Sequence, residues 1–304
     1  MPVYTAFKIA YDKKTVSLFN LPEIMQTVTA KPNTASVSKL VPRPPIVVVL
    51  GHIDHGKTKL LDAIRKTSVV DTESGGITQH IGASEVVHSG KRITFIDTPG
   101  HEAFSQMRSR GAHIADVGIL VVAADEGIKP QTQEALKVLQ ETKTPFVVAA
   151  NKVDKISGWY TKKGSNILET IKEQNINVQK ILDTKIYEIV GKLSEFNLNS
   201  ERFDRVEDYT KEIAIIPTSA KTGDGFDAML MVLAGLAQKY LEQSLKINVE
   251  GQGKATILEV TEEKGLGKTL DCVVYDGTIK INDKILIGTT EEVIESKVKR
   301  LFQL

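Results

Sequence analysis

Short apolar runs alternate with helical patterns through the middle of the chain. The first run, residues 46–50, is Ile-Val-Val-Val-Leu and precedes Gly51, a pattern typical of a strand buried on both faces of a parallel sheet. The strands expected after it are 92–96, 117–122, 146–150 and 213–216, and the expected helices include 60–64, 102–113, 131–141 and 226–245. Because strands alternate with helices, we predict an α/β fold with a doubly wound, mostly parallel sheet.

A polar stretch interrupts this alternation at about residues 157–212. It is too long for an ordinary connection, and its apolar residues have helical spacing at 167–172 and 178–193, so we predict a helical insert. The stretch contains Trp159, the single tryptophan of the chain, which we interpret as a packing residue.

The pattern changes at both ends of the chain. Residues 31–45 are rich in Pro, Thr, Ser and Asn without a sustained period, so we expect residues 1–44 to form a weakly ordered extension or linker. After residue 250, short strands separated by glycine-containing turns predict antiparallel β structure. We therefore expect an α/β domain at 45–248 and a partial antiparallel β-barrel domain at 249–304.

Composition and charge narrow the protein class only a little. The 304 residues are 41% hydrophobic and 25% charged, as in globular proteins, and the net charge of +1 provides no overall attraction for nucleic acid or membrane. The single cysteine, Cys272, leaves no intramolecular disulfide and fits a reducing compartment. The chain shows neither an apolar run of roughly 18 residues nor a secretory signal, so we expect a cytoplasmic protein without a membrane partner.

Residues 51–58, Gly-His-Ile-Asp-His-Gly-Lys-Thr, match a phosphate-binding pattern. They follow an expected strand and precede an expected helix, where backbone N–H groups and the positive helix end face phosphate oxygens. Lys57 would bring its charge to the β- and γ-phosphates, and the Thr58 hydroxyl would ligate Mg²⁺. The residues expected around the phosphates are Gly51, His52, Ile53, Asp54, His55, Gly56, Lys57 and Thr58.

The two histidines of this loop have a spacing that also suits a metal pair. No cysteine or further histidine completes such a site, so we place His52 and His55 in the phosphate loop instead.

Asp97-Thr98-Pro99-Gly100 follows the expected strand at 92–96. A carboxylate at a strand end near the phosphate loop is typical of the second half of a Mg²⁺ site, so we assign Asp97 to the metal. Gly100 would present its N–H to the γ-phosphate. The same four residues are also good turn formers, and that alternative stays open here.

Residues 151–154, Asn-Lys-Val-Asp, indicate which base is bound. The carboxylate of Asp154 can accept hydrogen bonds from N1–H and N2–H₂ of guanine, and adenine offers no such pair of donors. Lys152 would lie along the base, and Asn151 would tie the segment to neighbouring loops. After the strand at 213–216, backbone N–H groups of Ser219, Ala220 and Lys221 would bind guanine O6. An enzyme that uses ATP conflicts with Asp154.

These motifs, in this order, resemble translational GTPases. Residues 74–83, Ser-Gly-Gly-Ile-Thr-Gln-His-Ile-Gly-Ala, are similar to the first switch segment of bacterial translation initiation factor 2 and of its archaeal–eukaryotic counterpart, initiation factor 5B. The stretch from Gly158-Trp159 through residues 200–206 resembles the insert of the archaeal–eukaryotic branch. The resemblance covers residues 45–304 and implies a GTPase of the 5B type.

The resemblance also implies catalytic and switch residues. Thr78 would ligate Mg²⁺ in the GTP state and release it after hydrolysis. His101 would orient the attacking water, which makes it the expected catalytic residue together with Lys57 and Gly100.

Two positions of the phosphate loop need separate mention. Asp54 is similar to the acidic position that, with backbone near Gly82, holds a monovalent cation in this family. Lys59 stands where the family usually has Thr or Ser, so only its backbone N–H would serve the α-phosphate.

The resemblance implies a place in translation. We expect a monomeric, C-terminally truncated initiation factor with ribosome-stimulated GTP hydrolysis, acting in subunit joining and initiator tRNA placement. The tRNA would be engaged only through C-terminal domains that lie beyond residue 304. The alternative is a binding module that switches between GTP and GDP without full initiation activity.

Overall fold

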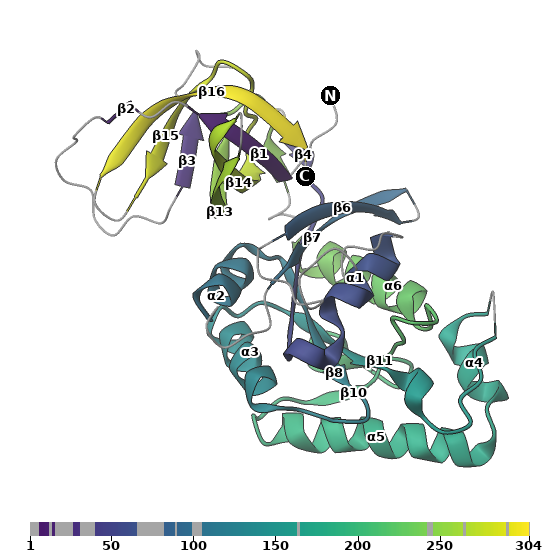
Figure 1. Ribbon diagram of the computed structural model, residues 1–304. Coiled ribbons are helices and arrows are strands. Elements are labelled where there is room, and N and C mark those ends of the chain that lie inside the picture. Colours follow the sequence, from purple (N-terminus) through teal and green to yellow (C-terminus); the bar gives the residue numbers. More distant parts are fainter. Residues whose placement is uncertain are drawn as a thin grey trace. The chain divides into compact units, whose positions relative to one another are not determined.

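A computed structural model shows the fold of the chain (Figure 1). It describes residues 6–11, 14–15, 27–30, 40–65, 82–88, 90–98, 105–162, 165–241, 246–263, 266–289 and 292–303. The chain divides into two compact units, the α/β unit of residues 46–80 and 95–241 and the β unit of residues 1–45, 81–94 and 242–304. Each unit is described by itself below, and residues 81–94 are described with the seven-stranded sheet in which they pair.

The α/β fold is built on a seven-stranded sheet with the strand order β10-β11-β9-β8-β5-β7-β6. Its strands are β5 (Ile46–Gly51), β6 (Gly82–His88), β7 (Lys91–Asp97), β8 (Val117–Ala123), β9 (Phe146–Asn151), β10 (Ser200–Arg202) and β11 (Ile213–Pro217). The pairs from β5 through β8, β9 and β11 to β10 are parallel, which confirms the predicted doubly wound, mostly parallel sheet. All residues of β5, β8 and β9 are buried, as their continuous apolar runs predict.

Helices cover both faces of this sheet. They are α1 (Lys57–Arg65), α2 (Ser105–Ile114), α3 (Pro130–Glu141), α4 (Ile167–Glu173), α5 (Ile176–Ser194) and α6 (Phe226–Leu241), with the short 3₁₀ turns η1 (Ile53–His55) and η5 (Val153–Lys155). In Figure 1, α2 and α3 lie together on one side of the central strands, and α1 and α6 lie on the other. Within the described residues, no helix is both long and apolar enough to cross a membrane.

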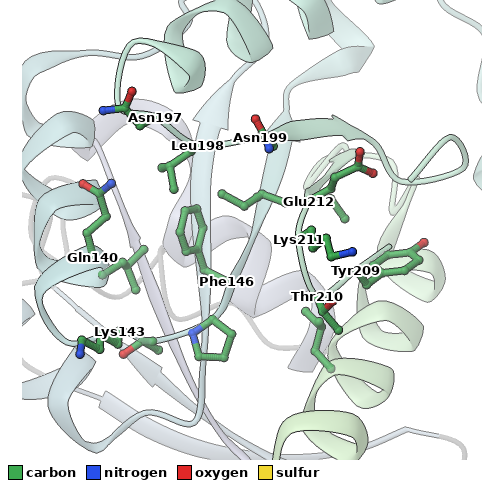
Figure 2. Close-up of a pocket in the computed structure, with 16 residues that line it drawn as sticks. Gln140, Lys143, Phe146, Asn197, Leu198, Asn199, Tyr209, Thr210, Lys211 and Glu212 are labelled. Atoms are coloured by element: carbon green, nitrogen blue, oxygen red, sulfur yellow. The ribbon is translucent and has the colours of Figure 1, made fainter. Parts of the chain in front are cut away.

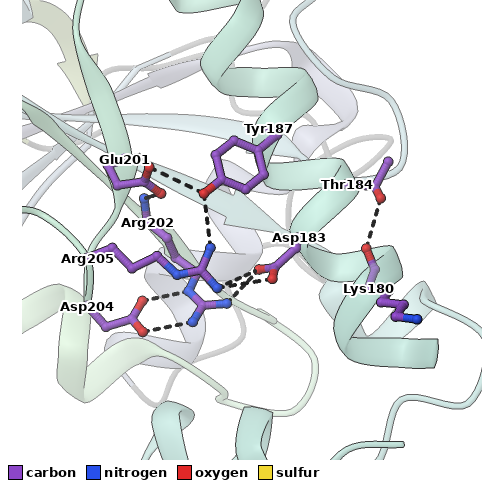
Figure 3. A network of polar contacts seen from close by, with 8 residues as sticks. All are labelled: Lys180, Asp183, Thr184, Tyr187, Glu201, Arg202, Asp204 and Arg205. Carbon is purple, nitrogen blue, oxygen red and sulfur yellow. Dashed lines mark hydrogen bonds and ion pairs between the residues drawn. The ribbon is translucent and has the colours of Figure 1, made fainter. Parts of the chain in front are cut away.

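A charged network fastens α5 to the edge strand β10 (Figure 3). Arg202 donates to Asp183 of α5 at 2.7 Å and, through Nε and Nη2, to both carboxylate oxygens of Asp204 at 2.6 and 2.8 Å. Arg205 donates to the same Asp183 at 3.0 Å. The helical spacing predicted at 167–172 and 178–193 corresponds to α4 and α5, so the polar stretch is packed structure and not a loop.

The β unit contains an antiparallel sheet with the order β1-β14-β13-β3-β15-β16-β2, and β1 pairs with β16 as well as β14, so the sheet closes on itself. Its strands are β1 (Ala6–Tyr11), β2 (Lys14–Thr15), β3 (Thr27–Ala30), β13 (Lys254–Glu263), β14 (Gly267–Asp276), β15 (Lys284–Gly288) and β16 (Val293–Gln303). Two further strands, β4 (Leu40–Pro42) and β12 (Lys246–Asn248), pair with each other. The predicted antiparallel barrel sheet is confirmed.

The N-terminal strands differ from the sequence-based expectation. We expected a weakly ordered segment at 1–44, whereas β1, β2 and β3 belong to the same sheet as the C-terminal strands. Phe7 of β1 pairs with Cys272 of β14, and Ile9 is fully buried in the core of this sheet. Partners so distant along the chain leave no periodic signal in a local stretch, which is why the pattern misses them. The domain boundaries at 44/45 and 248/249 stay a prediction.

Candidate nucleotide-binding site

The predicted phosphate and base motifs meet around one cavity of about 460 Å³ in the α/β unit. The cavity lies where β5 and β9 end, the edge at which parallel α/β sheets bind ligands. Its lining comprises Ile53, Asp54, Gly56, Lys57, Thr58, Lys59, Asn151, Lys152, Asp154, Lys155, Ala220 and Lys221. All of these except Lys155 are among the residues that the sequence assigns to nucleotide binding.

Two glycines shape the phosphate loop between β5 and α1. Gly51 has φ +143°, and a Cβ added there would lie 2.4 Å from the carbonyl oxygen of Val121. Gly56 has φ +86°, and its added Cβ would lie 2.7 Å from the side-chain amide of Asn151. Any larger residue at either position would force the loop away from the sheet, so the glycines hold the loop backbone at the cavity.

Lys57 begins α1 and folds back over this loop. Its ammonium donates to the carbonyl oxygens of Gly51 at 3.0 Å and His52 at 2.9 Å. Burial lowers the pKa of Lys57 to about 8, with Arg108 lowering it further and the carboxylates of Asp97 and Asp54 opposing the change. An incompletely solvated ammonium beside backbone carbonyls is suited to bind an anion, because a phosphate would stabilise its charged form.

His55 is a structural member of the loop. Its side chain is fully buried, and Nδ1 donates to the carbonyl oxygen of Val121 at 3.3 Å. Burial lowers the pKa of His55 to about 4, so the ring is neutral at pH 7. The ring of His52 meets it edge to face, with centroids 4.9 Å apart.

Asn151 joins the predicted phosphate loop to the segments predicted to bind the base. Its amide nitrogen donates to the carbonyl oxygen of His55 at 2.8 Å, and its amide oxygen accepts from the backbone N–H of Ala220 at 3.0 Å. Asn151 is 1% exposed, so both hydrogen bonds are shielded from water. This is the tie between loops that the sequence predicts for it.

The segment predicted to bind the base is held from both sides. Ser219 donates from its hydroxyl to Oδ1 of Asp154 at 2.6 Å, which fixes the carboxylate at the cavity. Lys152 has a left-handed backbone, and its ammonium donates to Glu126 at 3.1 Å. That hydrogen bond holds the pKa of Glu126 below its ordinary value. The carboxylate of Asp154 is therefore oriented by a neutral donor, the Ser219 hydroxyl.

The expected Mg²⁺ ligands in the described residues are both shielded. Thr58, in the first turn of α1, is 8% exposed, and Asp97, the last residue of β7, is 3% exposed. Thr98 donates its hydroxyl to the carbonyl oxygen of Val49 at 2.7 Å, which anchors the end of β7 to β5. A hydroxyl and a carboxylate are oxygen donors of the kind that Mg²⁺ prefers, so the residues present fit this ion.

The remaining predicted residues have no hydrogen bond described above. Thr78, Gly100 and His101 lie outside the described residues. Asp54 and Lys59 line the cavity with exposed side chains. Gly82 is the first residue of β6 and is exposed.

Sequence reasoning missed three supporting residues. Glu126 binds Lys152, Arg108 pairs with Glu134 at 2.7 Å while 1% exposed, and Asp224 accepts three side-chain hydrogen bonds beside the Ser219 loop. These residues carry no motif, so only their contacts in the fold reveal them: Arg108 and Asp224 are buried, and Glu126 is exposed but binds Lys152.

A second cavity of about 560 Å³ lies at the other end of β9, where Phe146 begins the strand (Figure 2). The residues that line it include Leu139, Leu198, Leu236, Lys143 and Lys211. It contains none of the predicted site residues and no glycine-rich loop. The nucleotide motifs therefore identify the cavity of 460 Å³ as the candidate site.

Comparison with protein families supports this assignment. The model of the elongation factor Tu GTP-binding domain matches residues 43–239, about two thirds of the chain and most of the α/β unit.

Individual relatives are more specific. A probable translation initiation factor IF-2 from Methanoculleus marisnigri is 52% identical over 276 residues, which cover 86% of this chain and 46% of that protein. Another from Methanopyrus kandleri is 51% identical over 279 residues, 86% of this chain and 47% of that protein. The crystal structure of GDP-bound aIF5B from Aeropyrum pernix superposes with a TM-score of 0.75 at 44% identity, covering 87% of this chain and 50% of that one. The chain spans about half the length of these relatives.

Proposed function

The chain belongs to the family of elongation factor Tu-type GTP-binding domains and, within it, to the IF-2/aIF5B initiation factors. On this premise we propose that it binds GTP and hydrolyses it in translation initiation. The observation that carries the proposal is the hydrogen bond from Ser219 to Asp154, whose side chain lines the candidate cavity. An oriented carboxylate at this place selects guanine, because guanine offers N1–H and N2–H₂ together.

The phosphate end of the site supports GTP as the substrate. The N–H groups of the loop at Gly56 and Lys57 and the N-terminus of α1 would bind the phosphate oxygens. Lys57 would exchange its bonds to Gly51 and His52 for the β- and γ-phosphates and neutralise charge that develops during phosphoryl transfer.

Mg²⁺ would be held by Thr58 and Asp97, with Thr78 as a third ligand in the GTP state. When bound, the ion supplies positive charge to the β- and γ-phosphate oxygens. Asp54 and the backbone near Gly82 would hold a monovalent cation.

We assign the attack on the γ-phosphate to a water oriented by His101, with Gly100 donating its N–H to the γ-phosphate. Such catalysis consists of positioning and electrostatic stabilisation, so turnover would depend on a partner that fixes the loop. We propose the ribosome as that partner, at the interface between its subunits, and a cytoplasmic, monomeric protein. Initiator tRNA would be engaged only through segments that the relatives have and this sequence does not cover.

The base assignment has a direct test. Asp154→Asn replaces an acceptor by an amide donor, which repels guanine and matches the C2 carbonyl of xanthine. We expect GTP affinity to fall roughly 100-fold and XTP binding and hydrolysis to appear. Binding is measured by displacement of N-methylanthraniloyl-GDP, with ATP, GTP and XTP as competitors.

Wild-type protein should bind GTP and leave ATP unbound, and Asp227→Asn, an exposed change outside the cavity, should keep wild-type selectivity. Equal binding of ATP and GTP by the wild type would refute guanine recognition.

A further inference from the structure

The loop that carries Ser219 is tied to the polar insert through one buried carboxylate, that of Asp224. Its Oδ2 accepts from the indole Nε1 of Trp159 at 3.1 Å, from the hydroxyl of Thr161 at 2.8 Å and from the hydroxyl of Thr222 at 2.8 Å. Asp224 is 8% exposed. Hydrogen bonds to a shielded charged acceptor are strong, so Asp224 holds residues of the insert and of the loop in one arrangement.

The backbone of Asp224 holds the same loop. Its carbonyl oxygen accepts from the N–H of Ser219 at 3.0 Å, and the N–H of Gly223 donates to the carbonyl oxygen of Ser219 at 2.8 Å. The hydroxyl of Ser219 in turn donates to Asp154. A shift of Asp224 would therefore move Ser219 and the carboxylate that Ser219 orients.

The insert joins these contacts into a closed path. Trp159 follows Asp154 closely along the chain, after the turn η5 and Gly158, whose φ is +84°. The backbone N–H of Trp159 donates to the carbonyl oxygen of Ile156 at 2.9 Å, so the connection is short and bent. The path runs from Asp154 along the chain to Trp159, through Asp224 to Ser219, and back to Asp154.

We propose that Asp224 is a positioning residue for guanine recognition, through which Trp159 and Thr161 of the insert aim the carboxylate of Asp154 at the base. The proposal rests on the proposed function, because it requires a guanine nucleotide in the cavity. It changes the interpretation of Trp159, which the sequence suggested to be a packing residue: its indole N–H has a specific acceptor.

The test compares two nucleotides that differ only at the base. Asp224→Asn keeps the size of the side chain but removes its charge, which weakens all three hydrogen bonds. We expect GDP affinity to fall about tenfold. IDP lacks the 2-amino group and makes one hydrogen bond fewer to Asp154, so the affinity for IDP should fall less. The ratio of GDP affinity to IDP affinity should therefore decrease about threefold. Both are measured by displacement of N-methylanthraniloyl-GDP.

Two further variants separate positioning from general damage. Asp227→Asn makes the same chemical change on the exposed first turn of α6 and should retain the wild-type ratio. Trp159→Phe keeps an aromatic ring but loses the indole N–H. Its ratio of GDP affinity to IDP affinity should therefore lie between the ratios of the wild type and of Asp224→Asn. Circular dichroism melts confirm that each variant is folded under the assay conditions.

Trp159 also provides a spectroscopic readout, because it is the only tryptophan of the chain. Binding of GDP should change its emission in the wild type and in Asp227→Asn, since the indole N–H belongs to the path that closes on the base. Asp224→Asn should lose most of this change even at saturating GDP.

The outcomes distinguish the two proposals. If Asp224→Asn lowers the affinities for GDP and IDP by the same factor, or keeps the wild-type change in Trp159 emission, Asp224 does not position Asp154. The proposal that the protein binds GTP would still stand after that result. If the wild type binds no GDP, the proposed function itself is overturned, and the positioning role with it.

Discussion

His55 places a neutral, fully buried imidazole inside the phosphate loop. Burial is the main reason that its pKa falls from 6.5 to about 4, and the neighbouring His52 and Lys152 lower it further against the opposing effects of Val121 O and Glu126. The folded protein therefore resists a proton that the unfolded chain accepts below pH 6.5. The stability of the α/β unit should be unaffected by His55 above this pH and decrease as the pH falls toward 4.

This effect predicts a specific pH dependence. Between pH 7 and pH 5 the wild type should lose about 2 kcal/mol of unfolding free energy through His55, in addition to losses from other groups. His55→Gln cannot take up the proton and should lack this component. Urea unfolding at the two pH values measures the difference. His113→Gln, which changes an exposed histidine of α2, should behave as the wild type, and equal pH slopes for all three proteins would contradict the assignment.

Sequence motifs point to the residues proposed to contact the nucleotide more readily than to the residues that support them. Asn151 and Asp154 are recognisable because they follow the phosphate-loop pattern and stand directly after a predicted strand. Glu126 and Asp224 are not recognisable, because an isolated carboxylate in a loop is usually solvated. Only the fold reveals that Asp224 is 8% exposed and faces three donors.

At the scale of elements, the insert depends on the arginine network of Figure 3. Arg202 is buried, and it binds Asp183 of α5 and Asp204. Burial tends to raise the pKa of Asp204, but the Arg202 hydrogen bonds outweigh it and hold the value below its ordinary range. The carboxylates are partly solvated, so the network contributes less than a fully buried ion pair.

Removal of this arginine should weaken the insert without changing the site. Arg202→Ala leaves two carboxylates without their shared donor, and we expect a loss of about 2–3 kcal/mol in urea unfolding. Arg205→Ala removes an exposed partner of the same Asp183 and should cost less than about 1 kcal/mol. GDP affinity should be unchanged in both, because no residue of the network lines the nucleotide cavity. If both variants lost the same free energy of unfolding, the burial of Arg202 would add nothing to the stability of the insert.

Elements differ in how well the sequence predicts them. The apolar runs of β5, β8 and β9 are evident because parallel strands are covered on both faces. The sequence does not predict β6, because its burial is only partial and its residues, Gly-Ala-Ser-Glu-Val-Val-His, contain no apolar run. The sequence does not predict β1 for another reason: the strands that it joins, β14 and β16, lie at the other end of the chain.

At the scale of the molecule, each unit has a core of its own. The β unit buries Ile9, Leu270, Cys272 and Val298 together, and this core joins a strand near residue 6 to strands after residue 250. Units with separate cores can unfold in separate steps. Trp159 lies in the α/β unit, so its fluorescence reports the unfolding of that unit alone, whereas circular dichroism reports both.

Ile9→Ala should therefore separate the two transitions. Loss of a fully buried isoleucine costs about 2–4 kcal/mol, and this loss should appear in circular dichroism while the Trp159 transition stays in place. GDP at about 100 times its dissociation constant should act in the opposite way, stabilising the Trp159 transition by about 2.7 kcal/mol and leaving the β transition unmoved. Val260→Ala, at a position 54% exposed on β13, is the matched control and should shift neither. If Ile9→Ala shifts both transitions equally, the two units unfold as one, and the N-terminal strand stabilises the nucleotide site as well as its own sheet.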